Sequence, residues 1–261
     1  MSITEVRVGE TSDSWQALWE KPAGKLRLTM LGGDTTQIIS AVGYGAGLSP
    51  RPMIIARREA TGAEYLVIME IYQGERSVKS VDSVQLPDAS GMTIRRTSDS
   101  GREATDRFFW RADTAGAPPT VIPLDNDHSF QAQEAFFRAG DDGQVVAMLM
   151  LDGTHVKTGE MGVGASLPTD VAVERAPDGI VSVVQTSGSD QTLTVQNSQW
   201  EGSQVRIFAL AESGEVVEKT PGEAEQAEAI SWQAESGVVY FLGTEPPGAE
   251  WLARYSVRVG R

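Results

Sequence analysis

The hydrophobic residues of this chain recur with a period of two rather than 3.6. In KLRLTML (Lys25–Leu31), Leu26, Leu28 and Met30 alternate with polar or charged residues. DVAVER and RYSVRVGR follow the same pattern, and the second is expected to be a strand with Tyr255 on its apolar face. Such alternation is typical of strands with one buried face. YLVIMEIY, QVVAMLML and GVVYFL are apolar on both faces, which favours central strands.

Glycine-bearing polar clusters separate these runs, and each is interpreted as a hairpin turn: EATGAE, DDG, LDGT, APDG and ESG. SFQAQEAFF has some helical character, but the hairpin signal directly after it favours a strand. GEAEQAEAIS (residues 222–231) is either a short helix or a solvated loop. Many short strands at regular spacing predict an all-β fold, either an antiparallel β-sandwich or stacked antiparallel sheets.

The stretch PMIIARRE (Pro52–Glu59), followed by EYLVIMEIY, raises a choice between a charged site and a simple hairpin. The pattern predicts a strand, a turn at ATGA and a returning strand. Alternation sends Arg57 and Arg58 to opposite faces. One arginine is expected to pair with an acid such as Glu70, leaving the other free to bind a sugar carboxylate. The simpler interpretation is that both are solvated charges at a hairpin end.

TAGAPPTVIPLDND (Thr114–Asp127) is the most linker-like stretch, because its three prolines interrupt strand pairing. It suggests a first β-sheet unit over residues 1–117 and a second over 118–261. Both units are expected to pack as one globular body.

Composition excludes several chemistries. The 261 residues contain no cysteine, so disulfides, zinc–thiolate sites, iron–sulfur clusters and cysteine nucleophiles are ruled out. With 36 acidic residues against 22 basic ones, the net charge is −14, which makes nucleic acid an unsuitable partner. No apolar run approaches the roughly 20 residues of a membrane helix. The N-terminal residues also lack the pattern of a signal peptide.

Candidate catalytic and metal-binding residues are few. The only histidines are His128, in the polar loop DNDH, and His155, after a turn, and neither completes a zinc site. The acidic loops DNDH, GDDG and SGSD leave calcium open, although none has EF-hand spacing. Neither GxSxG nor GxxxxGK[ST] occurs. We therefore expect no metal site, no required cofactor and no identifiable catalytic residue.

Aromatic residues supply another kind of candidate site. Six tryptophans are present, and an exposed indole can stack on the C–H face of a sugar ring, although core packing is the simpler role. The residues selected as carbohydrate-binding candidates are Arg57, Arg58, Trp19, Trp110 and Tyr72.

The region 12–160 resembles the C-terminal β-sheet region of heparinase II/III-like polysaccharide lyases. The similarity lies in SWQALWEKPAGKLRLTMLGGDTTQIISAVGYG, RPMIIARREATGAEYLVIMEIYQG and AFFRAGDDGQVVAMLMLDGTHV. In that family the catalytic tyrosine and histidine lie mainly in an α/α-toroid that precedes this region. The β-region metal site uses upstream histidines, and this chain has none before His128.

The resemblance implies a β-module without its catalytic module. Such a module would bind carbohydrate or support a lyase, and we do not expect it to be an enzyme by itself. Its partners would be a polysaccharide or a catalytic lyase module, in an extracellular or periplasmic setting. Two other interpretations stay open. One is a small lyase or glycoside hydrolase on a β-scaffold, and the other is a structural or assembly protein.

Overall fold

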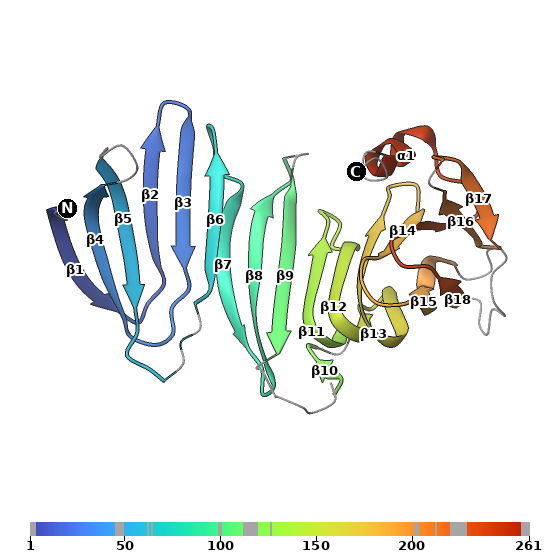
Figure 1. Cartoon of the computed structure of the whole chain (residues 1–261), viewed down its shortest axis with the longest axis horizontal. Helices are drawn as coiled ribbons and strands as arrows, with labels where there is room; N and C mark the ends of the chain where they lie inside the picture. The colour runs from blue at the N-terminus through green and yellow to red at the C-terminus, as the bar shows by residue number, and fades with distance from the viewer. Residues whose placement is uncertain are drawn as a thin grey trace. The chain divides into compact units, whose positions relative to one another are not determined.

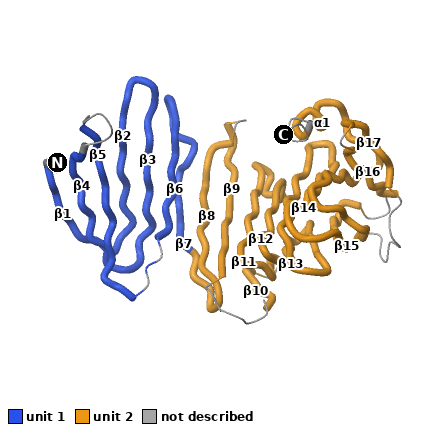
Figure 2. Tube along the Cα trace, viewed as in Figure 1, with its two compact units in different colours: residues 1–83 blue, residues 84–261 orange. Residues whose placement is uncertain are grey.

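A computed structural model describes residues 4–44, 50–61, 63, 65–98, 101–111, 120–125, 127–200, 204–211, 213–219 and 229–256. The chain forms two compact units, residues 1–83 and 84–261 (Figure 2). The boundary expected at 117/118 lies outside the described residues. Strands dominate both units, and each strand pair whose register is described is antiparallel, so the all-β prediction is confirmed. Among the described residues, no helix is long and apolar enough to span a membrane.

The first unit contains two three-stranded sheets (Figure 1). One has the order β1-β4-β5 and the other β2-β3-β6. β7 runs across the boundary into the second unit. The strand bounds are β1 (Thr4–Thr11), β2 (Trp15–Lys21), β3 (Gly24–Met30), β4 (Thr36–Tyr44), β5 (Pro50–Arg57), β6 (Val67–Tyr72) and β7 (Val78–Gln85).

The hairpin predicted from PMIIARRE and EYLVIMEIY is wrong, although both segments do form strands. β5 pairs with β4, and β6 pairs with β3 in the other sheet. The chain between them, residues 58–66, carries it from one sheet to the other, whereas a tight hairpin needs a loop of two to five residues. The local sequence pattern predicted both strands correctly, but it did not indicate which strands they pair with.

One face of the β2-β3-β6 sheet is apolar across all three strands. Directly opposed residues share a face in antiparallel pairs, so the registers define its rows. On β6 this face is open, with Met69 70% and Ile71 84% exposed. Three cross-strand rows form it: Trp15, Met30 and Val67; Ala17, Leu28 and Met69; Trp19, Leu26 and Ile71.

The second unit is built on one large sheet that branches at β13. The first half of β13 pairs with β15, which continues to β18, and the second half pairs with β14, which continues to β19, β16 and β17. On the other side the order runs β12, β11, β9 and β8. The bounds are β8 (Ala89–Thr97), β9 (Glu103–Arg111), β10 (Ile122–Pro123), β11 (Ser129–Ala139), β12 (Val145–Lys157), β13 (Met161–Arg175), β14 (Val181–Gln185), β15 (Gln191–Asn197), β16 (Arg206–Leu210), β17 (Val216–Lys219), β18 (Ala229–Ala234) and β19 (Val239–Gly243).

The core of the second unit lies among these strands. Phe130, Met150, Val171 and Leu193 are fully buried in one cluster that draws on β11, β12, β13 and β15. Inward residues alternate with half-buried or exposed ones in β15, which explains the period of two there, whereas β19 is buried on both faces. SFQAQEAFF lies in β11, so the preference for a strand there is confirmed.

The turn predictions have mixed outcomes. DDG and APDG close the β11–β12 and β13–β14 hairpins, with Gly143 and Gly179 at positive φ. The hairpin predicted at LDGT is wrong, because this segment lies inside β12 as a bulge. ESG occurs twice. The first copy, at 212–214, lies between β16 and β17, which pair with each other, and Gly214 has a positive φ, so a hairpin is confirmed there. The second copy, at 235–237, joins β18 to β19, which pair with other strands, so it is a turn without a hairpin.

The strand predicted for RYSVRVGR is also wrong where the structure describes it. Helix α1 (Ala249–Ser256) includes Tyr255, and the residues from 257 onward lie outside the described part. Trp251 and Tyr255 are four residues apart on one helical face, and the Tyr255 ring meets Phe241 edge-on at 5.6 Å. Only residues 229–231 of the candidate helix GEAEQAEAIS are described, and they belong to β18.

Candidate carbohydrate-binding sites

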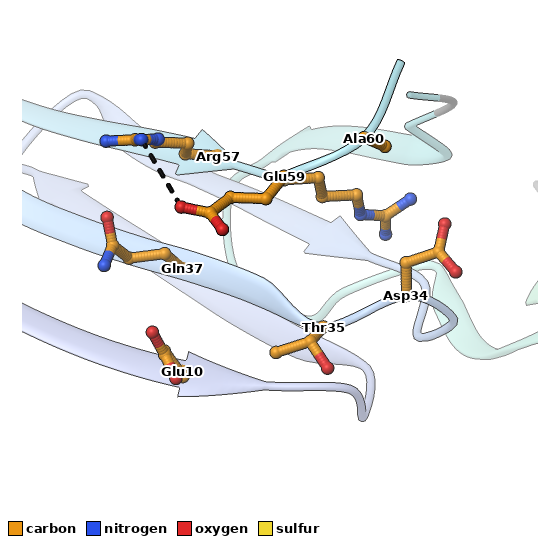
Figure 3. A pocket seen from close by; sticks show the side chains of 8 residues that line it. Glu10, Asp34, Thr35, Gln37, Arg57, Glu59 and Ala60 are labelled. Carbon is orange, nitrogen blue, oxygen red and sulfur yellow. Dashed lines mark ion pairs between the residues drawn. The ribbon is translucent and has the colours of Figure 1, made fainter. Parts of the chain in front are cut away.

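Arg57 and Arg58 lie in a polar pocket of about 450 Å³ in the first unit (Figure 3), named here the arginine pocket. Glu10, Gln37 and Arg57 are directly opposed on β1, β4 and β5, so they form one row across that sheet. The remaining residues come from the segments that precede β4 and follow β5. The lining consists of Glu10, Asp34, Thr35, Gln37, Arg57, Arg58, Glu59 and Ala60.

The two arginines differ in their surroundings. Arg57 is 63% exposed at its side chain and pairs with Glu59 at 3.6 Å, the contact drawn in Figure 3. The Nε of Arg58 donates to Thr36 Oγ1 at 2.8 Å, and its guanidinium lies 4.9 Å from the Tyr65 ring centre. Arg58 is therefore held by its neighbours, whereas Arg57 is exposed but has an acidic partner.

Glu70 is not the acid that pairs with either arginine, contrary to the prediction. It is buried on β6, where its Oε1 accepts hydrogen bonds from the backbone N–H groups of Ser77 and Val78 and from the Ser77 hydroxyl. These contacts hold the connection from β6 to β7. The prediction failed because it assumed that β5 and β6 were neighbours.

The arginine pocket does not select anions by charge. Glu10, Asp34 and Glu59 outnumber its two arginines, and Glu59 already pairs with Arg57. A ligand carboxylate would meet nearby like charges, which offset the attraction of the guanidinium groups.

A second site in the same unit has the opposite character. The Trp19 groove has a volume of about 780 Å³, and its lining contains three cationic residues and no carboxylate. Its lining residues are Trp19, Lys21, Ala23, Gly24, Lys25, Leu26, Pro50, Arg51, Pro52 and Ile71.

The β-strand registers explain how this groove is built. Trp19, Leu26 and Ile71 form one row of the apolar sheet face. Lys21 follows Trp19 by two residues, so alternation places it on the same face. Arg51 reaches the groove from the start of β5, where proline stands on either side of it in the sequence.

The side chain of Lys25 does not point into the groove, because it lies with its partners Glu20 and Tyr72 on the sheet face away from Trp19. Its Nζ lies 2.8 Å from Glu20 Oε1. The hydrogen bond and the negative charge of Glu20 raise the pKa of Lys25, so this amine stays protonated. By contrast, the side chains of Lys21 and Arg51 are exposed. Within the described part of the chain, neither makes a hydrogen bond or an ion pair. These two cations are the ones available to an anion.

The other two sequence candidates lie elsewhere. Tyr72 opposes Lys25 and so lies on the sheet face opposite to Trp19, where its hydroxyl accepts from Arg27 at 3.3 Å. Trp110 belongs to β9 of the second unit and stacks on Phe108 at 5.7 Å. The structure therefore brings Arg57 and Arg58 together, places Trp19 in a different groove, and gives no common site for all five.

The DNDH loop is organised around Asp125. Its Oδ1 accepts from the backbone N–H groups of Asp127 and His128 and lies 2.7 Å from His128 Nδ1, while Arg107 approaches Oδ2 at 3.4 Å. Burial opposes ionisation of Asp125, but these hydrogen bonds prevail and lower its pKa to about 2. Among the described residues no group of three or more potential ligands is arranged to hold a metal ion.

His155 lies inside β12 and does not follow a turn, contrary to the sequence prediction. It lies in β12 opposite Gln131 and Gly164, and it is partly buried. Burial, together with the charge of Lys157, lowers its pKa. Its position between two strands accounts for this environment.

Comparisons with known proteins add no identification. No protein-family model matches the sequence, and no curated protein matches it. The resemblance to heparinase II/III-like lyases therefore stays a prediction based on the residue pattern.

Sequence reasoning found Trp19 but missed Lys21 and Arg51. Alternation along WQALWEK places Lys21 on the face of Trp19, and that signal was available. Nothing local indicates that β5 lies close enough to β2 for Arg51 to complete the groove, because the two strands belong to different sheets.

Proposed function

We propose that this chain is a non-catalytic β-module that binds an acidic polysaccharide in the Trp19 groove. The observation that carries the proposal is the lining of that groove, which joins an aromatic ring and an apolar row to the two exposed cations Lys21 and Arg51 and contains no carboxylate. An indole can stack on a sugar ring, and exposed Lys and Arg groups can bind uronate carboxylates.

The charge distribution supports an anionic ligand in the first unit. Residues 1–83 contain nine Lys/Arg and ten Asp/Glu, whereas residues 84–261 contain 13 and 26. The net charges are −1 and −13, which together give the −14 of the chain. An acidic polymer is thus repelled mainly by the second unit, while the groove offers local positive charge.

A binding role is favoured over turnover because the groove lacks a suitable proton-transfer group. Its lining contains no Tyr, His, Asp or Glu, and the raised pKa of Lys25 makes that amine a poor general base. We expect the isolated chain to release no unsaturated products from acidic polysaccharides.

The proposal is tested by affinity electrophoresis in gels that contain a polyuronate. Lys21→Ala combined with Arg51→Ala should weaken retention by about tenfold or more, because two charge-assisted contacts are lost. Lys79→Ala is the matched control, since it removes an exposed cation of the same unit outside the groove. A carboxyl-reduced form of the same polymer should not retain the wild-type chain. Equal retention of the double variant and wild type would rule out this site.

A further inference from the structure

The Trp19 groove continues into a second groove along β2. This β2–β5 groove has a volume of about 480 Å³ and shares Trp19 and Pro52 with the first. Its remaining lining residues are Glu5, Arg7, Trp15, Gln16, Ala17, Leu18, Ile38, Ser40, Ala41, Val42, Met53 and Ile54. The first groove adjoins the Lys21 end of β2, and the second extends to Trp15 at the other end.

The second groove follows the edges of two strands. Consecutive residues from both faces of β2 line it, as do consecutive residues of β5. Among the described strands, β2 pairs only with β3, and β5 pairs only with β4, so each strand has one open edge. Backbone N–H and C=O groups at open edges need hydrogen-bond partners, and sugar hydroxyls can serve as both donors and acceptors.

Arg7 places a further cation on this path. It opposes Ser40, which in turn opposes Ile54, so all three share one face of the β1-β4-β5 sheet. The register of β1 shifts between Thr4 and Arg7, and Glu5 within this irregularity has a φ of 55°. Bulges re-aim side chains, and a non-glycine residue in the left-handed region is strained, a combination that is common beside binding sites.

From this continuity we infer that the ligand is an extended chain of several uronate residues, running from Lys21 and Arg51 past Trp19 to Arg7. The inference rests on the proposed function and specifies the form of its ligand. Lys21 and Arg51 line the first groove, and Arg7 lines the second beside Glu5, so cations spaced along the path complement carboxylates spaced along a polymer. The seven residues of β2 span roughly 20 Å, which is more than a single sugar ring needs.

A ladder of oligouronates from the dimer to the decamer tests this inference by calorimetric titration. Affinity should rise with length until both grooves are filled. Arg7→Ala should weaken binding of the longest oligomers about tenfold and leave the dimer unchanged, because only long chains reach it. Lys21→Ala with Arg51→Ala should weaken binding at every length. Lys79→Ala again serves as the control for a lost charge.

The outcomes separate the two proposals. Longer ligands also gain affinity from the number of ways they can bind, so the decisive quantity is the dependence of the Arg7→Ala effect on length. An effect that is equal at all lengths, or absent at all lengths, overturns the extended path. The binding function stands in that case if the Lys21/Arg51 variant is still impaired. If no oligomer binds in a manner that depends on Lys21 and Arg51, the proposed function fails as well.

Discussion

Asp152 and Gly153, adjacent in β12, show why the hairpin predicted from an Asp-Gly pair does not form here. Asp-Gly usually marks a hairpin, yet here it forms a bulge. Asp152 has a φ of 46°, and its N–H donates to Asp170 Oδ1 at 2.8 Å. Gly153 packs against Ala132 of β11 so closely that a Cβ would collide with the Cβ of that alanine. The close approach of β12 to Ala132 therefore explains why residue 153 is a glycine, and the bulge explains the strained backbone of Asp152.

These neighbours should respond in opposite ways to substitution. Gly153→Ala is expected to lower the free energy of unfolding by about 2 kcal/mol or more, since two packed strands must separate. Asp152→Gly should be neutral or stabilise by up to about 1 kcal/mol, because glycine adopts this conformation without strain. Urea denaturation measures both. A Gly153→Ala protein as stable as wild type would show that the bulge does not constrain this position.

Two aspartates of the second unit make the free energy of unfolding depend on pH in the acidic range. The pKa of Asp125 is about 2, as described above. Burial opposes ionisation of Asp106, but hydrogen bonds and charge from Arg138 and Arg96 prevail and lower its pKa. A carboxyl whose folded pKa lies below its unfolded value stabilises the protein above the unfolded pKa. That stabilisation is lost as the pH falls from about 4 through the folded pKa.

We therefore expect the free energy of unfolding to fall between pH 4 and pH 2. Asp125→Asn should flatten this dependence only slightly, by about 1 kcal/mol or less, because the side chain is 44% exposed and its pairs are screened. Asp106→Asn should flatten it more, and it should already lower stability at neutral pH by about 3 kcal/mol. Denaturant titrations at several pH values provide the measurement. Identical pH profiles for wild type and Asp106→Asn would contradict the account.

At the scale of elements, β6 shows what determines strand partners in the first unit. The buried Glu70 carboxylate fixes the start of β7 by accepting three hydrogen bonds through one oxygen. On the opposite face of β6, Met69 and Ile71 belong to the apolar face of the β2-β3-β6 sheet. β6 is thus placed by contacts with β3 and with the following connection, not with β5.

Glu70→Ala should lower the free energy of unfolding by about 2 kcal/mol, because two backbone N–H groups and the Ser77 hydroxyl lose a charged acceptor. Glu75→Ala is the matched control, since this neighbouring glutamate is exposed, and it should change stability by less than about 0.5 kcal/mol. A double-mutant cycle between Glu70 and Arg58 should give a coupling energy near zero. A coupling energy above about 1 kcal/mol would contradict this structure and support the Glu70–Arg58 ion pair that the sequence suggested.

Strand positions followed well from the sequence, but strand partners did not. Alternation in KLRLTML predicted β3, because burial of one face requires that pattern, and the hairpin signal directly after SFQAQEAFF predicted β11. The pairing of β6 with β3 and the branching at β13 depend on contacts between distant segments, which leave no local trace. At the C-terminus, RYSVRVGR alternates like a strand, yet its first residues are helical because Trp251 and Tyr255 pack as one face on β19.

At the scale of the whole molecule, the unequal division of charge is the main determinant of the proposed function. The net charge of −14 argued against nucleic acid as a partner and did not show that the first unit is nearly neutral. Trp19 was predictable as a candidate, and Lys21 follows from alternation. Arg51 and Arg7 were not predictable, because they reach the groove from a different sheet. The proposed recognition thus depends on a surface that exists only after both sheets have formed.

The most direct test of the central claim is an NMR titration of the full chain with an oligouronate, following the amide and indole resonances. The account predicts the largest shift changes at the Trp19 indole and at the amides of Lys21 and Arg51, with little change near Arg57 and Arg58. The Trp110 indole in the second unit serves as an internal reference and should not move. Shift changes confined to the arginine pocket or to the second unit would contradict the claim that the Trp19 groove is the binding site.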